Sequence, residues 1–151
     1  MALLLDTEDP SVAGARRGDP LAWADLYERF HPVLARYLEV VDPDALEDLD
    51  ARWAQAARDL VGQPEGVDPL IWLLRSFRSG LVCQLDPESA ADPAIRAIRS
   101  LEPVAMEVIA LRVIAGLNDV DVAAVTGSSI HRVRTASHQG LAHLVKLMDD
   151  A

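Results

Sequence analysis

The sequence predicts an all-α fold of two small helical bundles joined by a short linker, the second containing a helix-turn-helix. Half of its 151 residues are apolar, which is typical of a globular chain. Only 5% are aromatic, and β-branched residues never alternate with polar ones over the length of a strand. Ala, Leu, Arg, Asp and Glu dominate instead, a composition that favours helices.

The composition excludes several classes of protein. The single cysteine, Cys83, rules out a disulfide framework and a Cys-rich zinc site. The apolar run MALLLD is too short for a signal peptide, and nothing approaches the roughly 18 apolar residues of a membrane span. No nucleophile–base pair and no phosphate loop can be recognised. We therefore expect a cytoplasmic protein that is not an enzyme, holds no metal or cofactor and does not contact a membrane.

The first bundle, residues 1–85, should contain three main helices. Each follows an Asp-Pro pair: Asp19-Pro20, Asp42-Pro43 and Asp68-Pro69. In the first pair, Asp19 can cap the helix and Pro20 fits its first turn. The first helix has an apolar stripe of Trp23, Leu26, Phe30, Leu34 and Tyr37. Pro32 interrupts this pattern and removes a backbone donor, so we expect a kink or a break there. The third helix, LIWLLRSFRSGLVCQL, is apolar on nearly every side and should be central.

The second of these helices begins with an exposed acidic cluster of Asp44, Glu47, Asp48 and Asp50. Acids at a helix N-terminus interact favourably with the helix dipole, and that effect alone explains most of them. The same residues could instead form a docking face for a basic partner. Both interpretations stay open at the level of the sequence.

A short acidic linker, residues 86–93, separates the two predicted bundles. Its sequence, DPESAADP, carries a proline near each end, which favours a domain boundary. The second bundle, residues 94–151, begins with a short helix. Pro103 then opens a strongly apolar helix that Gly116 ends, and we expect this helix to be the buried centre of the bundle.

Residues 118–144, NDVDVAAVTGSSIHRVRTASHQGLAHL, predict two helices joined by a tight turn. Asn118 can cap the first helix, and Gly127 stands where a left-handed residue is needed. Ser128 or Ser129 can cap the second helix. Its expected apolar stripe is Ile130, Val133, Leu141 and Leu144, with Ser137 and Gly140 as small members.

The polar face of this second helix is the candidate site for DNA. His131, Arg134, Thr135 and His138 share one strip by their spacing, and Arg132 flanks it. No acidic residue occurs from 129 to 146, although the whole chain has 24 acids and 14 bases. A helix-turn-helix places such a helix in the major groove. The alternative is a pair of packed helices whose polar face is simply solvated.

The charge of the chain is divided unevenly. Residues 1–92 carry 18 acids and 8 bases, whereas residues 93–151 carry 6 of each. Because neutralisation of phosphates supplies most non-specific DNA affinity, the acidic first part is a poor candidate for DNA binding. The electrically balanced second part can approach DNA.

Three stretches of the chain carry a family resemblance. They are GDPLAWADLYERFHPVLARYL from Gly18, WLLRSFRSGL from Trp72 and LEPVAMEVIALRVIAGLNDVDVAAVTGSSIHRVRTASHQGLAHL from Leu101. In this order, over roughly residues 18–147, they resemble an extracytoplasmic-function (ECF) sigma factor. The resemblance implies that the first bundle docks on the RNA polymerase core and opens the −10 promoter element. It also implies that the second bundle reads the −35 element of promoter DNA through residues 129–144.

The third helix departs from the family pattern. Ser79, Cys83 and Asp86 stand where family members usually carry Asn, Asp and Arg, which removes groups that could hold a splayed base. Two interpretations therefore follow. The chain is either a divergent sigma factor that directs polymerase to promoters, or a sigma-like regulatory protein that binds an anti-sigma factor or another regulator without initiating transcription.

Overall fold

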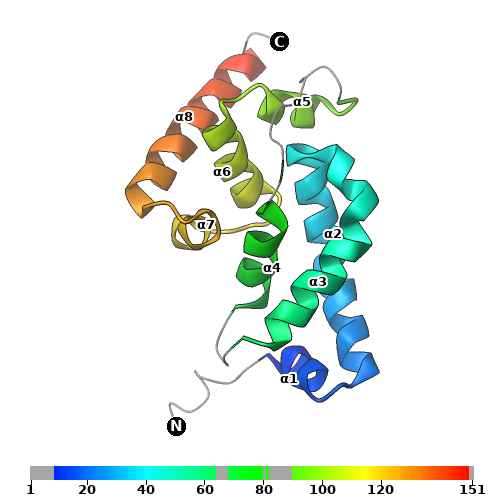
Figure 1. Cartoon of the computed structure of the whole chain (residues 1–151). Coiled ribbons are helices and arrows are strands. Elements are labelled where there is room, and N and C mark those ends of the chain that lie inside the picture. Colours follow the sequence, from blue (N-terminus) through cyan, green and yellow to red (C-terminus); the bar gives the residue numbers. More distant parts are fainter. Residues whose placement is uncertain (1–8, 64–67, 80, 82–89, 150–151) are drawn as a thin grey trace.

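A computed structural model describes residues 9–63, 68–79, 81 and 90–149. All regular secondary structure in these residues is helical, so the predicted all-α class is confirmed (Figure 1). None of the helices within these ranges is both long and apolar enough to cross a membrane. In chain order the elements are α1 (Pro10–Arg16), α2 (Pro20–Val41), the 3-10 helix η2 (Pro43–Asp48), α3 (Leu49–Val61), α4 (Pro69–Arg78), α5 (Pro93–Arg99), α6 (Pro103–Val113), α7 (Asp119–Thr126) and α8 (Ile130–Asp149).

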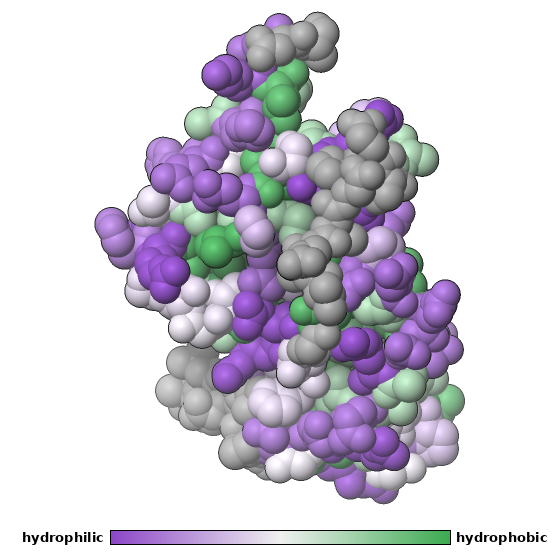
Figure 2. All heavy atoms as spheres, turned by 45° about the horizontal axis from the view of Figure 1, so that its top comes forward, coloured by the Kyte–Doolittle hydropathy of each residue, from purple (hydrophilic) through white to green (hydrophobic). Residues whose placement is uncertain are grey.

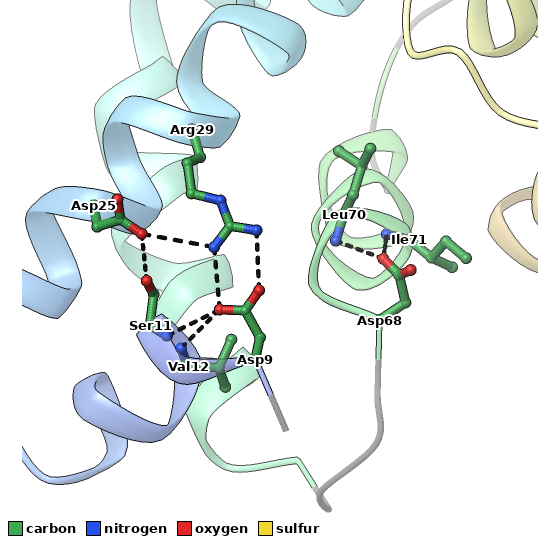
Figure 3. A network of polar contacts seen from close by, with 8 residues as sticks. All are labelled: Asp9, Ser11, Val12, Asp25, Arg29, Asp68, Leu70 and Ile71. Carbon is green, nitrogen blue, oxygen red and sulfur yellow. Dashed lines mark hydrogen bonds and ion pairs between the residues drawn. The ribbon is translucent and has the colours of Figure 1, made fainter. Parts of the chain in front are cut away.

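Aspartate caps begin several helices, as the Asp-Pro pairs predict. Asp19 accepts a hydrogen bond from the backbone N–H of Leu21 at 3.0 Å. Asp68 accepts from the first turn of α4, at 2.9 Å from Leu70 and 3.2 Å from Ile71 (Figure 3). These side chains satisfy N–H groups that have no partner within the helix.

The N-terminus of α1 is fixed to α2 by a polar network (Figure 3). Asp9 caps α1 and also forms a two-pronged ion pair with Arg29, with Nη1–Oδ1 at 3.1 Å and Nη2–Oδ2 at 2.9 Å. Asp25 lies beside the same guanidinium and accepts a hydrogen bond from the Ser11 hydroxyl. The short helix α1 is therefore held by charge as well as by its buried side chains.

All three predicted first-bundle helices differ from expectation. The second does not begin as an α-helix after Asp42-Pro43: the chain forms the 3-10 helix η2 there, Asp42 makes no side-chain cap, and α3 begins at Leu49. α2 continues through Pro32 as one helix of 22 residues, so the proline does not break it. α4 ends at Arg78, with Ser79 in an extended conformation, rather than running on to residue 85. α4 is nevertheless central, because it buries Leu73, Leu74 and Phe77 and contacts α2, α3 and α7.

The N-terminal part, α1 to α4, packs directly against the C-terminal part, α5 to α8. α2 contacts α5 and α6, and α4 contacts α7 (Figure 1). One cluster of buried hydrophobic side chains extends across both parts. The division into two bundles at residues 86–93 stays a prediction, and residues 86–89 lie outside the described ranges.

A buried arginine links the two parts at the C-terminus of α2. The carbonyl of Glu39 lacks its usual helical donor, because the residue four positions later is Pro43, which has no N–H. Arg99 of α5 is 7% exposed. It donates from Nη2 to the Glu39 carbonyl and from Nε to the Val40 carbonyl, the latter at 3.0 Å. A side chain from the C-terminal part thus supplies hydrogen-bond donors to the last carbonyl groups of a helix in the N-terminal part.

Candidate nucleic-acid interface

α7 and α8 are joined by a turn whose geometry follows from three polar or small residues. The Asn118 side chain accepts a hydrogen bond from the Asp121 N–H at 2.8 Å and caps α7. Gly127 adopts the left-handed conformation, with φ 72°, and its N–H bonds to the Ala123 carbonyl. Ser129 then caps α8 by accepting from the Arg132 N–H at 3.1 Å. Of the two predicted serine caps, Ser129 makes this contact.

The buried face of α8 consists of small side chains: Val133, Ala136, Ser137 and Gly140. A Cβ atom built on Gly140 would lie 2.8 Å from Cγ1 of Ile109. α8 therefore packs on α6 at a distance that only glycine allows.

The predicted apolar stripe of α8 is partly wrong. Ile130 is 38% exposed and Leu141 is 45% exposed, although Val133 and Gly140 are buried as expected. The 20-residue α8 is much longer than the 11-residue α6 on which it packs, and among the described residues part of its apolar face stays exposed. Its last turns project at the top of Figure 2, where hydrophobic side chains lie between hydrophilic ones. Exposed apolar residues in these turns are Val145, Leu147 and Met148.

The polar strip predicted for DNA binding lies on the exposed side of α8. All five predicted residues are exposed: His131, Arg132, Arg134, Thr135 and His138. They divide between two hollows on either side of the helix. One hollow, of about 330 Å³, is formed by the N-terminal end of α6 and includes His131, Arg132 and Thr135. The other, of about 370 Å³, includes Arg134 and His138.

Asp119 in the first turn of α7 connects two cations beside this second hollow. Its Oδ1 accepts from Nη1 of Arg112 on α6, and its Oδ2 pairs with Nε of Arg134 on α8 at 3.4 Å. The same Arg112 nitrogen donates to the buried hydroxyl of Ser137 at 3.0 Å. Arg112, Asp119 and Ser137 were not among the predicted site residues. Their contacts join three helices, and no local spacing in the sequence indicates them.

The acidic residues predicted for partner binding lie on η2 and the start of α3. Asp44, Glu47, Asp48 and Asp50 are all exposed, as expected. Asp50 accepts a hydrogen bond from the Tyr27 hydroxyl at 3.2 Å. Loss of water contact and the nearby Asp50 carboxylate raise the pKa of Tyr27 above its ordinary value. These four carboxylates therefore form an accessible negative surface on the N-terminal part.

Of the three residues at which the third helix departs from the family pattern, one is described by the structure. Cys83 and Asp86 lie outside the described residues, whereas Ser79 is exposed and its carbonyl accepts from Arg52 at 3.3 Å. Within the described part of the chain, no group of three or more His, Cys, Asp or Glu residues could hold a metal ion.

The chain matches no protein-family model, no curated protein and no solved structure.

Proposed function

We propose that the chain is a divergent ECF-type sigma factor that directs RNA polymerase to promoters through a helix-turn-helix formed by α7 and α8. The observation that carries the proposal is the arrangement of α8. Its small residues pack on α6, while the strip of His131, Arg134, Thr135 and His138, with Arg132 beside it, is exposed.

The chemistry of the strip suits the major groove. Arginine donates to phosphate oxygens or, in two-pronged fashion, to the edge of guanine. Threonine and histidine can bond to either bases or phosphates. Because the first turns of a recognition helix enter the groove, residues 131–138 lie in the part of α8 that would reach base edges. The absence of acids from 129 to 146 lowers the repulsion between α8 and the phosphates.

The N-terminal part fits a different role in the same protein. With 18 acids and 8 bases in residues 1–92, it is a poor ligand for DNA but a suitable one for a basic protein surface. The exposed cluster of Asp44, Glu47, Asp48 and Asp50 would meet the RNA polymerase core. DNA recognition and polymerase docking would thus belong to opposite parts of the chain.

In vitro transcription tests this function directly. The full chain and the cognate core polymerase are mixed with a library of promoter fragments, and transcripts that require the chain are sequenced. We expect such transcripts to share a sequence upstream of their start sites, and Arg134→Ala to reduce their yield. If the chain binds the core polymerase but yields no transcript above that of the core alone, the sigma-factor function is wrong.

The second candidate is a sigma-like regulatory protein that binds an anti-sigma factor or another regulator without initiating transcription. The exposed acidic cluster supports it, because a basic surface on a regulator would complement these carboxylates. A pull-down with the wild type and with a variant carrying Asp44→Asn, Glu47→Gln, Asp48→Asn and Asp50→Asn separates the two. Capture of a regulator in place of polymerase subunits, abolished in the variant, would support this candidate.

A further inference from the structure

We propose that the hollow between α6, α7 and α8 binds a backbone phosphate of duplex DNA, with Arg112 and Arg134 as its two cationic ligands. This inference rests on the proposed DNA-binding function and adds to it. Arg112 lies outside the exposed strip on α8 and outside the helix-turn-helix itself. It would make the DNA contact surface include the central helix α6.

The hollow is large enough to admit a phosphate group, and charged and polar side chains line it. Its volume is about 370 Å³, and its walls come from the end of α6, the start of α7 and the middle of α8. The residues that form it are Arg112, Asp119, Arg134, Ser137, His138 and Leu141. Because Arg134 and His138 belong also to the exposed strip, a duplex lying on that strip would run past the opening of the hollow.

Both guanidinium groups are held in place by one carboxylate. Asp119 accepts from Arg112 through Oδ1 and from Arg134 through Oδ2, so the two arginines are fixed on either side of it. Ser137, which is 3% exposed, holds Arg112 from a third direction. Asp119 and Ser137 are thus positioning residues. Together they order the Arg112 side chain before a ligand arrives, which lowers the entropy cost of binding. Asp119 also keeps the 66% exposed Arg134 side chain beside the hollow through its 3.4 Å contact.

Most of the donors on these arginines remain available. A guanidinium carries five N–H groups. In the contacts of the described residues, Arg112 donates through Nη1 alone and Arg134 through Nε alone. The Ser137 oxygen accepts from Arg112, which leaves its own hydroxyl proton to donate. A phosphate oxygen entering the hollow would meet several N–H donors at once.

The charge of the site matches a phosphodiester. Two arginines and one aspartate give a local net charge of +1, which one phosphodiester of a DNA strand would neutralise. Without Asp119 the site would carry two positive charges and would suit a doubly charged phosphate ester better. The presence of a carboxylate beside the cations therefore favours a backbone phosphate over a free phosphate monoester.

The salt dependence of binding measures this interaction. Fluorescence anisotropy of the full chain with mixed-sequence duplex DNA gives the slope of log affinity against log salt. The magnitude of this slope decreases by about 0.9 for each phosphate that the protein no longer neutralises. We expect Arg112→Gln to lower the magnitude of the slope by about that amount. Lys146→Gln removes one positive charge from an exposed site near the end of α8, so this control should change the slope much less.

A second measurement keeps the test valid if Arg112→Gln perturbs the fold. A duplex selected from random DNA on the wild-type chain is synthesised with single neutral methylphosphonates at successive positions. One methylphosphonate should weaken binding of the wild type and of Arg112→Lys, which keeps the cation, and have little further effect on Arg112→Gln. A scan in which Arg112→Gln loses as much affinity as the wild type at every position would overturn the proposal.

The remaining outcomes separate this inference from the function on which it rests. If Arg134→Gln lowers the slope while Arg112→Gln does not, the hollow is not a phosphate site, although the strip still binds DNA. If the wild type shows no salt-dependent DNA binding, the proposed function itself fails. If inorganic phosphate binds at Arg112 and mixed-sequence DNA does not compete with it, the hollow takes a free anion and the DNA assignment is wrong.

Discussion

Arg78 of α4 and Glu107 of α6 form a two-pronged ion pair across the boundary between the N-terminal and C-terminal parts. Nε of Arg78 lies 3.0 Å from Oε2 of Glu107, and Nη2 lies 2.8 Å from Oε1. Tyr37 of α2 donates to the same carboxylate at 3.1 Å. The Glu107 side chain is 15% exposed, so three helices converge on a largely buried charge.

Arg78→Gln should destabilise the protein, because it leaves the largely buried Glu107 carboxylate without its Arg78 partner. We expect a loss of roughly 1–2 kcal/mol in the free energy of unfolding, limited by the partial exposure of Arg78. Urea denaturation followed by circular dichroism measures it. Arg75→Gln, at an exposed position of the same helix, should change the unfolding free energy by much less. Equal effects of the two substitutions would show that the pair adds no stability.

Gly140→Ala should destabilise the protein even though alanine favours helices more than glycine by about 1 kcal/mol. The added methyl group would lie 2.8 Å from Cγ1 of Ile109, a side chain with no exposed surface. We expect overpacking to outweigh the gain in propensity and to cost a net 1–3 kcal/mol or so, measured by thermal or urea unfolding.

Gly62→Ala is the matched control, since a Cβ there would meet its nearest neighbour, the Asp59 carbonyl, at 3.4 Å. It should be close to neutral. Combining Gly140→Ala with Ile109→Ala should cost less than the sum of the single substitutions, because the second removes the atoms that clash with the first. If the unfolding free-energy costs of Gly140→Ala and Ile109→Ala simply add, the close approach of α6 and α8 is not the cause of the destabilisation by Gly140→Ala.

Asp9→Asn should make stability less sensitive to acid. The Arg29 guanidinium, helped by the backbone N–H groups of Ser11 and Val12, lowers the pKa of Asp9 below its ordinary value of 3.8. The stabilisation from the charged form is therefore complete above that value and is lost as the pH falls through the lower pKa of the folded state. Asparagine can still cap α1, so the substitution removes mainly the charge.

The measurement is the free energy of unfolding of wild type and Asp9→Asn between neutral pH and pH 3 or so. The wild type should be the more stable at neutral pH, and the difference should shrink toward the acid end. A difference that stays constant with pH would mean that the Asp9–Arg29 pair does not persist in solution.

Limited proteolysis should cut the chain within residues 86–93, where acidic and small residues lie between two prolines. Because the two parts share a buried apolar cluster, we expect the fragments to elute together in size-exclusion chromatography and to separate in denaturant. Mass spectrometry locates the cut. A protease-resistant core that spans residues 86–93 would show that the predicted boundary is wrong.

Arg134→Ala should weaken DNA binding of the full chain without unfolding it, because the Arg134 side chain is 66% exposed. If Arg134 contacts a guanine edge, the loss should be about 1–3 kcal/mol at one base position; if it contacts a phosphate, affinity should fall alike on all sequences. Val133→Ala is a poor comparison, since Val133 is buried and would report on folding. Unchanged affinity of Arg134→Ala on every duplex would remove this residue from the interface.

Features set by neighbouring residues were predictable from the sequence. The helix starts at Pro20, Pro69 and Asp119 and the left-handed turn at Gly127 depend on capping groups within a few positions. The exposed strip on α8 likewise follows from helical spacing alone. The all-α class required no more than composition and periodicity.

Features that depend on distant packing were not predictable. The exposure of Leu141, which borders the hollow lined by Arg112 and Arg134, depends on how α6, α7 and α8 pack, and helical periodicity carries no such information. The joining of Arg112 and Arg134 by Asp119 is a contact among three helices. The burial of Arg99 likewise depends on helix packing between the two parts of the chain. A single sequence contains no local signal for any of these.

The contact of Arg99 with the end of α2 limits how this protein can be divided or recombined. The donors for the Glu39 and Val40 carbonyls come from a residue about sixty positions later in the chain. Exchange of either half for that of a relative would therefore require an arginine at the same place, or a residue other than proline at position 43. The two halves are expected to evolve as a matched pair, even if each performs a separate task.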